Sequence, residues 1–129
     1  MRVFAIKWFT KFARGESISD RVLCDAAAEV VAGVFDADLG GSLYKKRVAR
    51  EGQGKSAGYR LIVGYREPET DRVVFLFGFP KSVADNITSG ARDLFSTAAE
   101  TFIKATDAQV AKLVAEKKYR QLDCEGVPP

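Results

Sequence analysis

The sequence predicts an α+β fold: a small antiparallel sheet of about four strands, with an N-terminal helix and C-terminal helices packed against it. Short apolar or alternating runs, typical of strands, occupy residues 2–9, 43–50, 59–66 and 72–79. The last three runs follow one another with only loops between them, which favours antiparallel pairing. Apolar residues recur at helical spacing before and after this group of strands.

The N-terminal part is predicted to form one strand and one helix. The run RVFAIKWF at residues 2–9 suits a first strand. A helix is expected over 20–35, where apolar residues follow a helical spacing and Ser17 or Ser19 can serve as the N-cap. The DLGG sequence at residues 38–41 has the composition of a turn.

The middle of the chain is predicted to be a three-stranded meander. Residues 43–50 and 59–66 alternate between two faces, whereas residues 72–79 are almost continuously apolar, as expected for a central strand. A polar hairpin loop at 67–71 joins the last two strands. The glycine-rich segment 51–58 is predicted to be mobile.

The C-terminal part is predicted to hold two helices. Thr88 or Ser89 caps the first helix. Its expected apolar face consists of Ala91, Leu94, Phe95, Ala98 and Phe102. Thr106 and Gln109 match a capping box, which opens the second helix.

Length and composition set the limits of the fold and its chemistry. The chain of 129 residues suits one domain, expected over 2–105, with a C-terminal helix extension over 106–122 and a flexible tail over 123–129. It has no histidine, which excludes Ser-His-Asp triads, Cys-His pairs and histidine-ligated zinc. Cys24 and Cys124 fit no metal or redox spacing, and two cysteines suit a reducing cytosol better than a disulfide scaffold.

The expected location is the cytoplasm. The opening MRVFAIKWF is too short and too charged for a signal peptide. No window of the sequence approaches the roughly 20 apolar residues of a membrane span.

Positive charge is concentrated in one part of the chain. Residues 44–66 hold seven Lys and Arg residues and one acid, Glu51, so this segment carries a net charge of seven minus one, or +6, whereas the whole chain carries +3. The remaining residues are therefore acidic on balance. A charge concentrated on two strands and their connecting loop indicates a surface for a polyanion.

The basic strands have two interpretations. One is a solvated face, because strands of an antiparallel sheet often expose charges on one side. The other is a phosphate-binding face, since Lys45 and Arg47 share one face of their strand and Arg60 and Arg66 share one face of theirs. Adjacent like charges on paired strands repel, and a bound anion relieves that repulsion.

Two further features of this segment are also open to both interpretations. Tyr44, Tyr59 and Tyr65 lie between the basic residues, where tyrosines can stack on bases or pack in the core. The Gly-Lys-Ser sequence around Lys55 is not a Walker A motif, because the upstream glycine spacing and the downstream helix are missing, so nucleotide hydrolysis is excluded. Lys55 and nearby amides can still contact a phosphate backbone.

The sequence resembles the RelE/ParE superfamily of type II toxins, and most closely its RelE/HigB-like branch. The resemblance rests on YKKRVAREGQGKSAGYRLIVGY, a hairpin loop and then VVFLFGFPKSVADNI. That branch often shows a basic strand, a Gly/Lys loop, a GYR-type strand and an apolar strand that ends in Lys before an Asn-Ile pair. The resemblance covers roughly residues 2–105.

The resemblance implies a small cytoplasmic toxin that is neutralised by an antitoxin encoded by the adjacent gene. Members of this branch cleave mRNA on the ribosome, where the 2′-OH of the RNA attacks the adjacent phosphate. The ribosome and mRNA are thus expected partners, with no membrane, no cofactor and no metal. The antitoxin is expected to cover the face of residues 44–66 with an acidic segment, or to block docking sterically.

The resemblance also implies roles for individual residues. The expected catalytic residues are Lys45, Arg47, Arg60, Lys81 and Asp85. The expected RNA-binding residues are Lys46, Arg50, Lys55, Tyr59 and Arg66. Lys45 and Arg47 would clamp the phosphate, and Arg60 would stabilise the charge of the transition state. The chain departs from the family in lacking a histidine and a tyrosine shortly after the last strand, so the proton-transfer group stays open between Lys45, Lys81 and Asp85.

Two alternative functions stay open. ParE-like members of the superfamily poison DNA gyrase instead of cutting RNA, and a fold does not determine a function. The chain can also be a non-catalytic RNA-binding domain, or a decayed toxin that still binds its antitoxin.

Overall fold

The structure is a computed structural model of the 129-residue chain, and it describes residues 1–50, 54–67, 71–82 and 86–125. The elements in chain order are β1 (Arg2–Ile6), α1 (Lys7–Gly15), α2 (Asp20–Val31), β2 (Ala37–Gly40), β3 (Leu43–Arg50), β4 (Gly54–Gly64), β5 (Arg72–Pro80), α3 (Ser89–Lys104), α4 (Asp107–Ala115) and β6 (Tyr119–Leu122).

The strands of the described residues form one six-stranded sheet in the order β2-β3-β4-β5-β1-β6. Strands β2 to β5 form an antiparallel meander, β1 pairs with β5 in parallel, and β6 pairs with β1 in antiparallel orientation. The α+β class is confirmed, but the sheet is larger than the four strands that the sequence predicted, and it contains a parallel pair.

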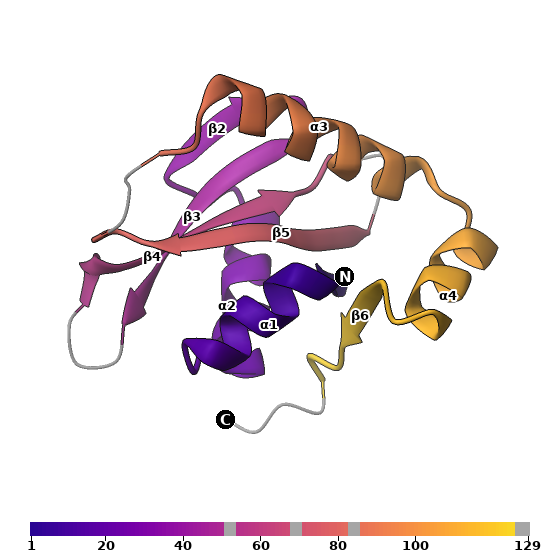
Figure 1. The fold of residues 1–129 in the computed structure, drawn as a ribbon, viewed down its shortest axis with the longest axis horizontal. Helices are drawn as coiled ribbons and strands as arrows, with labels where there is room; N and C mark the ends of the chain where they lie inside the picture. Colours follow the sequence, from indigo (N-terminus) through magenta and orange to yellow (C-terminus); the bar gives the residue numbers. More distant parts are fainter. Residues whose placement is uncertain (51–53, 68–70, 83–85, 126–129) are drawn as a thin grey trace.

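Helices cover both faces of the sheet (Figure 1). Helices α1 and α2 lie against one face, and α3 crosses the other. Each face has its own core: Leu61 and Val63 of β4 face α1 and α2, while Ile62, between them, packs in the core beneath α3, which contributes Phe102. This alternation follows from the period of two along a strand. We refer to these two sides as the α1–α2 face and the α3 face.

The first predicted strand was too long. Strand β1 ends at Ile6, and α1 begins at Lys7. From there the periodicity changes, since Phe9 and Ala13 are buried while Lys11 and Arg14 are exposed. A strand of five residues that runs directly into a helix leaves no turn residue between them, and the sequence therefore looked like one apolar run.

Helix α2 begins where the sequence indicated and ends earlier. The side chain of Ser19, not Ser17, accepts a hydrogen bond from the backbone N–H of Val22 at 3.2 Å and caps the helix. The helix ends at Val31, four residues before the predicted end, and Gly33 follows with a positive φ of 86°. Part of the predicted turn at 38–41 belongs to strand β2.

The C-terminal helices have the predicted caps. Thr88 caps α3, and Thr106 with Gln109 forms the full capping box of α4. The predicted apolar face of α3 was wrong at Leu94, which is 74% exposed. The buried side of the helix is instead completed by Ala99 and other residues nearer its C-terminus.

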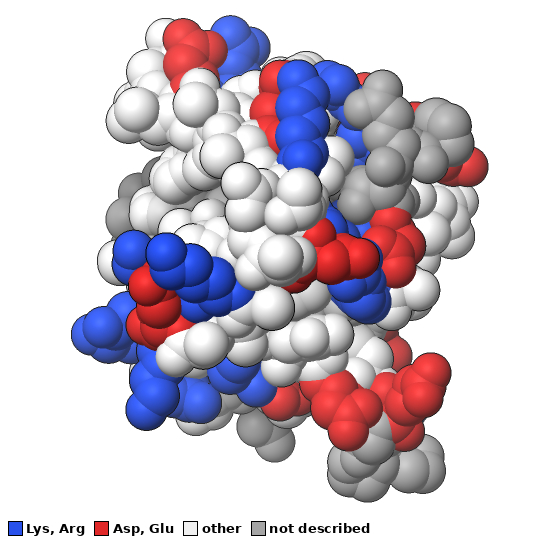
Figure 2. All heavy atoms as spheres, turned by 90° about the vertical axis from the view of Figure 1, so that its right-hand side faces the viewer, with Lys and Arg blue, Asp and Glu red and all other residues white. Residues whose placement is uncertain are grey.

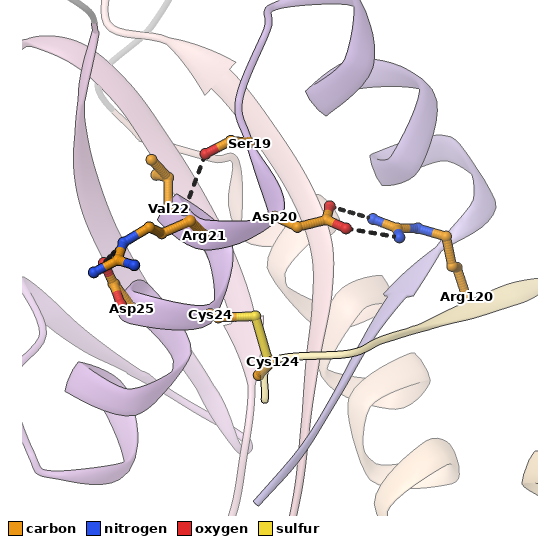
Figure 3. Close-up of a disulfide and its surroundings, with 8 residues drawn as sticks. All are labelled: Ser19, Asp20, Arg21, Val22, Cys24, Asp25, Arg120 and Cys124. Carbon is orange, nitrogen blue, oxygen red and sulfur yellow. Dashed lines mark hydrogen bonds and ion pairs between the residues drawn. A yellow bond between two sulfur atoms is a disulfide. The ribbon is translucent and has the colours of Figure 1, made fainter. Parts of the chain in front are cut away.

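The C-terminal segment contributes to the sheet rather than extending from it. Strand β6 pairs with β1, with Val3 opposite Leu122, in a region where the sequence indicated only the end of a helix and a flexible tail. The chain then reaches α2, where Cys124 forms a disulfide with Cys24 (Figure 3). The expectation of unpaired cysteines was wrong. The two cysteines are 100 residues apart in sequence, and they come together only because the chain reaches α2 after β6 pairs with β1.

Candidate nucleic-acid interface

Strand register brings three of the predicted catalytic residues onto the α3 face. Arg47 on β3 lies directly opposite Arg60 on β4. Lys45 lies opposite Ile62, whose side chain belongs to the core under α3, so Lys45 and Arg47 share that face, as predicted. Lys45 and Arg47 are two residues apart on β3, and Arg60 is the partner of Arg47 on β4, so the three cations are neighbours on one face of the sheet.

Arg60 is the most deeply buried of these cations. Its side chain is 1% exposed and is the largest fully buried side chain among the described residues. It lies in a row between Arg47 on one strand and Phe79 on the next. Arg60 was predicted to stabilise the transition-state charge, and its burial leaves almost none of its side chain open to solvent.

The protein's own acids neutralise part of the basic segment. Arg47 donates from Nε to Asp36 at 2.8 Å, and its backbone N–H donates to the same carboxylate at 2.6 Å. Burial by itself would raise the pKa of Asp36, but these bonds from Arg47 outweigh it and hold the pKa low. Arg66 pairs with Glu100 of α3 at 3.5 Å. These acids lie outside residues 44–66, so the local sequence overstated the charge of the folded surface.

Two predicted RNA contacts lie on the wrong face. Lys46 is 3% exposed on the α1–α2 face, where its Nζ pairs with Glu29 of α2 at 3.0 Å. Tyr59 is 3% exposed and packs edge-on against Phe12 of α1, with ring centroids 6.0 Å apart. Burial, with a smaller contribution from Glu16, raises the pKa of Tyr59. Both residues are core elements, and the stacking interpretation of Tyr59 was wrong.

The remaining predicted residues are distributed around the strand ends. Lys45 is half-buried and its Nζ contacts Oδ1 of Asn86 at 3.4 Å. Lys81 is exposed just after β5, and its backbone N–H donates to Gly58. Arg50 is exposed, with its guanidinium carbon 5.8 Å from the Tyr59 ring centroid. Asp85 lies outside the described residues, as does the side chain of Lys55, whose backbone belongs to β4.

The sequence did not reveal a second basic site, at the other end of the sheet. A groove of about 480 Å³, here called the α1–β6 groove, lies between α1 and the end of α4 with β6. Its basic lining residues are Lys7, Lys11, Arg14, Lys117 and Arg120. The helical spacing of Lys7, Lys11 and Arg14 could have indicated this basic row, but the strand predicted over residues 2–9 includes Lys7 and so obscures the helix.

Two other kinds of functional feature are absent from the described residues. No helix among them is long and apolar enough to cross a membrane. No group of three or more Cys, Asp or Glu side chains in the same part of the chain has an arrangement that could hold a metal ion.

The fold and the basic face define a small α+β domain with cations arranged on one side of its sheet. The family model for the RelE toxin of the RelE/RelB toxin–antitoxin system matches residues 1–122, and the chain belongs to this family. It is therefore a toxin of a toxin–antitoxin system, with an antitoxin of the RelB type as its partner. Neither the curated proteins nor the solved structures contain a match to the chain.

Proposed function

We propose that this toxin is a ribosome-dependent mRNA endoribonuclease that acts in the cytoplasm. In this proposal the 2′-OH of the RNA attacks the adjacent phosphate and the 5′-oxygen leaves, without a metal or cofactor. The observation that carries the proposal is the placement of Lys45, Arg47 and Arg60 on one face of neighbouring strands. Cations at such spacing favour the negative charge that develops on a pentacoordinate phosphate.

The three cations take different roles in the proposal. The side chain of Lys45 has no acid partner among the described residues, and its one hydrogen bond there is the long contact with Asn86. Arg47 is 43% exposed and is held in place by Asp36, so it can bind a phosphate while keeping that ion pair. Arg60, buried beside Arg47 on the next strand, adds positive charge to the site without being open to solvent.

Proton transfer and backbone contacts complete the proposed site. Lys45, Lys81 and Asp85 stay the candidates for the acid and the base. Arg50, Lys55 and Arg66 are proposed to contact the backbone of ribosomal or messenger RNA. Lys46 and Tyr59 are left out, because both are buried on the α1–α2 face.

The test is inducible expression in a bacterial host, with primer extension on a translated reporter mRNA. The Lys45→Met variant keeps the aliphatic stem and removes the charge, and we expect growth arrest and cleavage within codons to be lost. Lys104→Met removes an exposed charge from α3, where Lys104 pairs with Glu100 at 3.8 Å, and should cleave like the wild type. Arg60→Ala is less informative, because it also empties a fully buried position.

A specific observation supports a second candidate, a non-catalytic RNA-binding or decayed toxin. Lys46, Arg47 and Arg66 are each paired with an acid of the protein itself, which reduces the need for an external anion. Expression without growth arrest or mRNA cleavage would favour this candidate. Arrest with intact mRNA would instead move the target to gyrase or another essential protein.

A further inference from the structure

The α1–β6 groove is formed by segments that are far apart in sequence. The backbone N–H of Lys7 donates to the carbonyl of Lys118 at 3.0 Å, which joins the start of α1 to the residue just before β6. Figure 2 views this end of the molecule: Lys and Arg side chains gather on one flank, at the lower left, with acidic side chains among them, and a separate acidic group lies at the lower right. The groove lies four strands away from β3 across the sheet.

The lining of the groove contains five cations and no acid. One cation, Arg120, is neutralised by Asp20 of α2, with two contacts of 2.6 and 3.1 Å (Figure 3). The hydrogen bonds from Arg120 lower the pKa of Asp20, and the charge of Arg14 lowers it further. Within the described part of the chain, Lys7, Lys11, Arg14 and Lys117 have no acid within salt-bridge distance.

The groove therefore carries four cations without an acid partner among the described residues, whereas part of the positive charge on the α3 face is already paired. On the α3 face, Arg47 and Arg66 are bound by acids of the protein itself. In the groove, four cations face a shared cavity with no such acid. Repulsion between them is unfavourable in the free protein and is relieved when an anionic ligand enters.

Two buried polar groups at the groove also lack partners. Thr10 lines the groove and is 8% exposed, and its hydroxyl has no hydrogen-bond partner. The Nε of Arg120 is buried and unpartnered as well. Buried polar groups in native proteins are nearly always hydrogen-bonded, so an unpartnered pair at one cavity indicates a missing acceptor. A carboxylate supplies such acceptors.

We propose that the α1–β6 groove binds an acidic, partly apolar segment of the antitoxin. Lys7, Lys11 and Arg14 stand at i, i+4 and i+7 on α1 and form a row about 10 Å long. Carboxylates one turn apart on a partner segment match this row. The walls of the groove include Val114 and Tyr119, which suit the apolar parts of a peptide, whereas phosphates of an RNA backbone require only cations.

The proposal rests on the family membership of the chain and not on its proposed nuclease activity. It also changes the expected position of the antitoxin's acidic contact, from residues 44–66 to the other end of the sheet. Failure of the cleavage experiment would leave this proposal standing, because the test measures binding alone.

The test uses the full chain and the protein encoded by the adjacent gene. The two are purified separately, and their dissociation constant is measured by isothermal titration calorimetry at low and high salt. We expect the double variant Lys11→Glu and Arg14→Glu to weaken binding about 100-fold and to reduce its salt dependence. Lys112→Glu reverses a charge on α4 outside the groove and should change the affinity less than about threefold.

A second variant separates binding from folding. Lys117 has a positive φ of 61°, a conformation that glycine adopts more readily. Lys117→Gly should therefore keep or raise the midpoint of thermal unfolding while weakening antitoxin binding about five- to tenfold. Loss of binding in this variant without loss of stability supports a direct contact.

Two results would overturn the proposal. One is the absence of binding between the wild-type chain and the adjacent gene product. The other is an unchanged antitoxin affinity in the double variant, and if that variant also loses co-sedimentation with ribosomes, the groove is assigned to RNA.

Discussion

At the scale of single residues, burial divides the cations of the basic strands into two kinds. Lys45 and Arg47 are partly exposed, whereas Lys46 and Arg60 are 3% and 1% exposed. The period of two along β3 predicted correctly that Lys45 and Arg47 share a face. It did not predict which side chains are covered, because that depends on α2 and α3, which are distant in sequence.

A second feature at the scale of single residues is the hydroxyl of Thr10. It is buried without a hydrogen-bond partner, and burying such a group costs about 1–3 kcal/mol of desolvation. Thr10→Val replaces the hydroxyl with a methyl group of similar size, and we expect the free energy of unfolding to rise by about 1 kcal/mol. Urea denaturation measures the change. Thr97→Val, on an exposed part of α3, removes a hydroxyl that donates to Asp93 at 3.1 Å and should not stabilise the protein. A destabilised Thr10→Val variant would mean that the hydroxyl has a partner in solution.

At the scale of elements, the sequence predicted best where one local signal dominated. Strand β3 matches its predicted bounds, 43–50, because charged and apolar residues alternate throughout it. The capping box at Thr106 placed the start of α4 correctly. Helix α1 and strand β6 were missed, since each is short, and β6 is stabilised by pairing with β1, more than 100 residues earlier.

The junction of β5, α3 and α4 depends on one buried cation. Arg72 is 5% exposed; its Nη1 donates to the carbonyls of Phe102 at 3.0 Å and Ala105 at 2.7 Å, and its Nη2 donates to Asp107 at 2.7 Å. A cation at this position satisfies carbonyls at the C-terminus of α3 and complements the helix dipole. The side-chain hydrogen bond from Arg72, followed by that from Arg2, lowers the pKa of Asp107.

We expect Arg72→Leu to lower the free energy of unfolding by about 3 kcal/mol, because these carbonyls lose their donor in a buried site. Urea denaturation followed by circular dichroism measures this loss. The control is Arg92→Leu, which removes an exposed cation from α3, the helix whose C-terminal carbonyls Arg72 binds, and should change stability by less than about 0.5 kcal/mol. Equal losses in the two variants would show that Arg72 does not hold the junction.

At the scale of the whole molecule, the two basic sites lie at opposite ends of one sheet. Strand β3 carries the proposed nuclease face, and β6 borders the α1–β6 groove, with β4, β5 and β1 between them. An antitoxin segment in the groove leaves the β3 face uncovered, so inhibition through the groove alone requires that the rest of the antitoxin blocks access to the ribosome. The +6 charge of residues 44–66 indicated the β3 site but overstated its net charge, because ion pairing and burial reduce that charge after folding. It gave no indication of the groove, whose cations lie outside residues 44–66.

The disulfide between Cys24 and Cys124 is expected to contribute to the global stability of the protein. It joins α2 to the residue two positions after β6 and closes a loop of 100 residues. In the chain-entropy model a loop of this length contributes about 5 kcal/mol, because the bond restricts the unfolded chain. We expect the double variant Cys24→Ser and Cys124→Ser to lose about this much in urea denaturation and to show faster amide exchange in β6. Wild-type protein treated with a reductant should behave like the double variant. Two titratable thiols in the native protein, purified without reductant, would contradict the disulfide, and unchanged stability in the double variant would contradict its contribution to the fold.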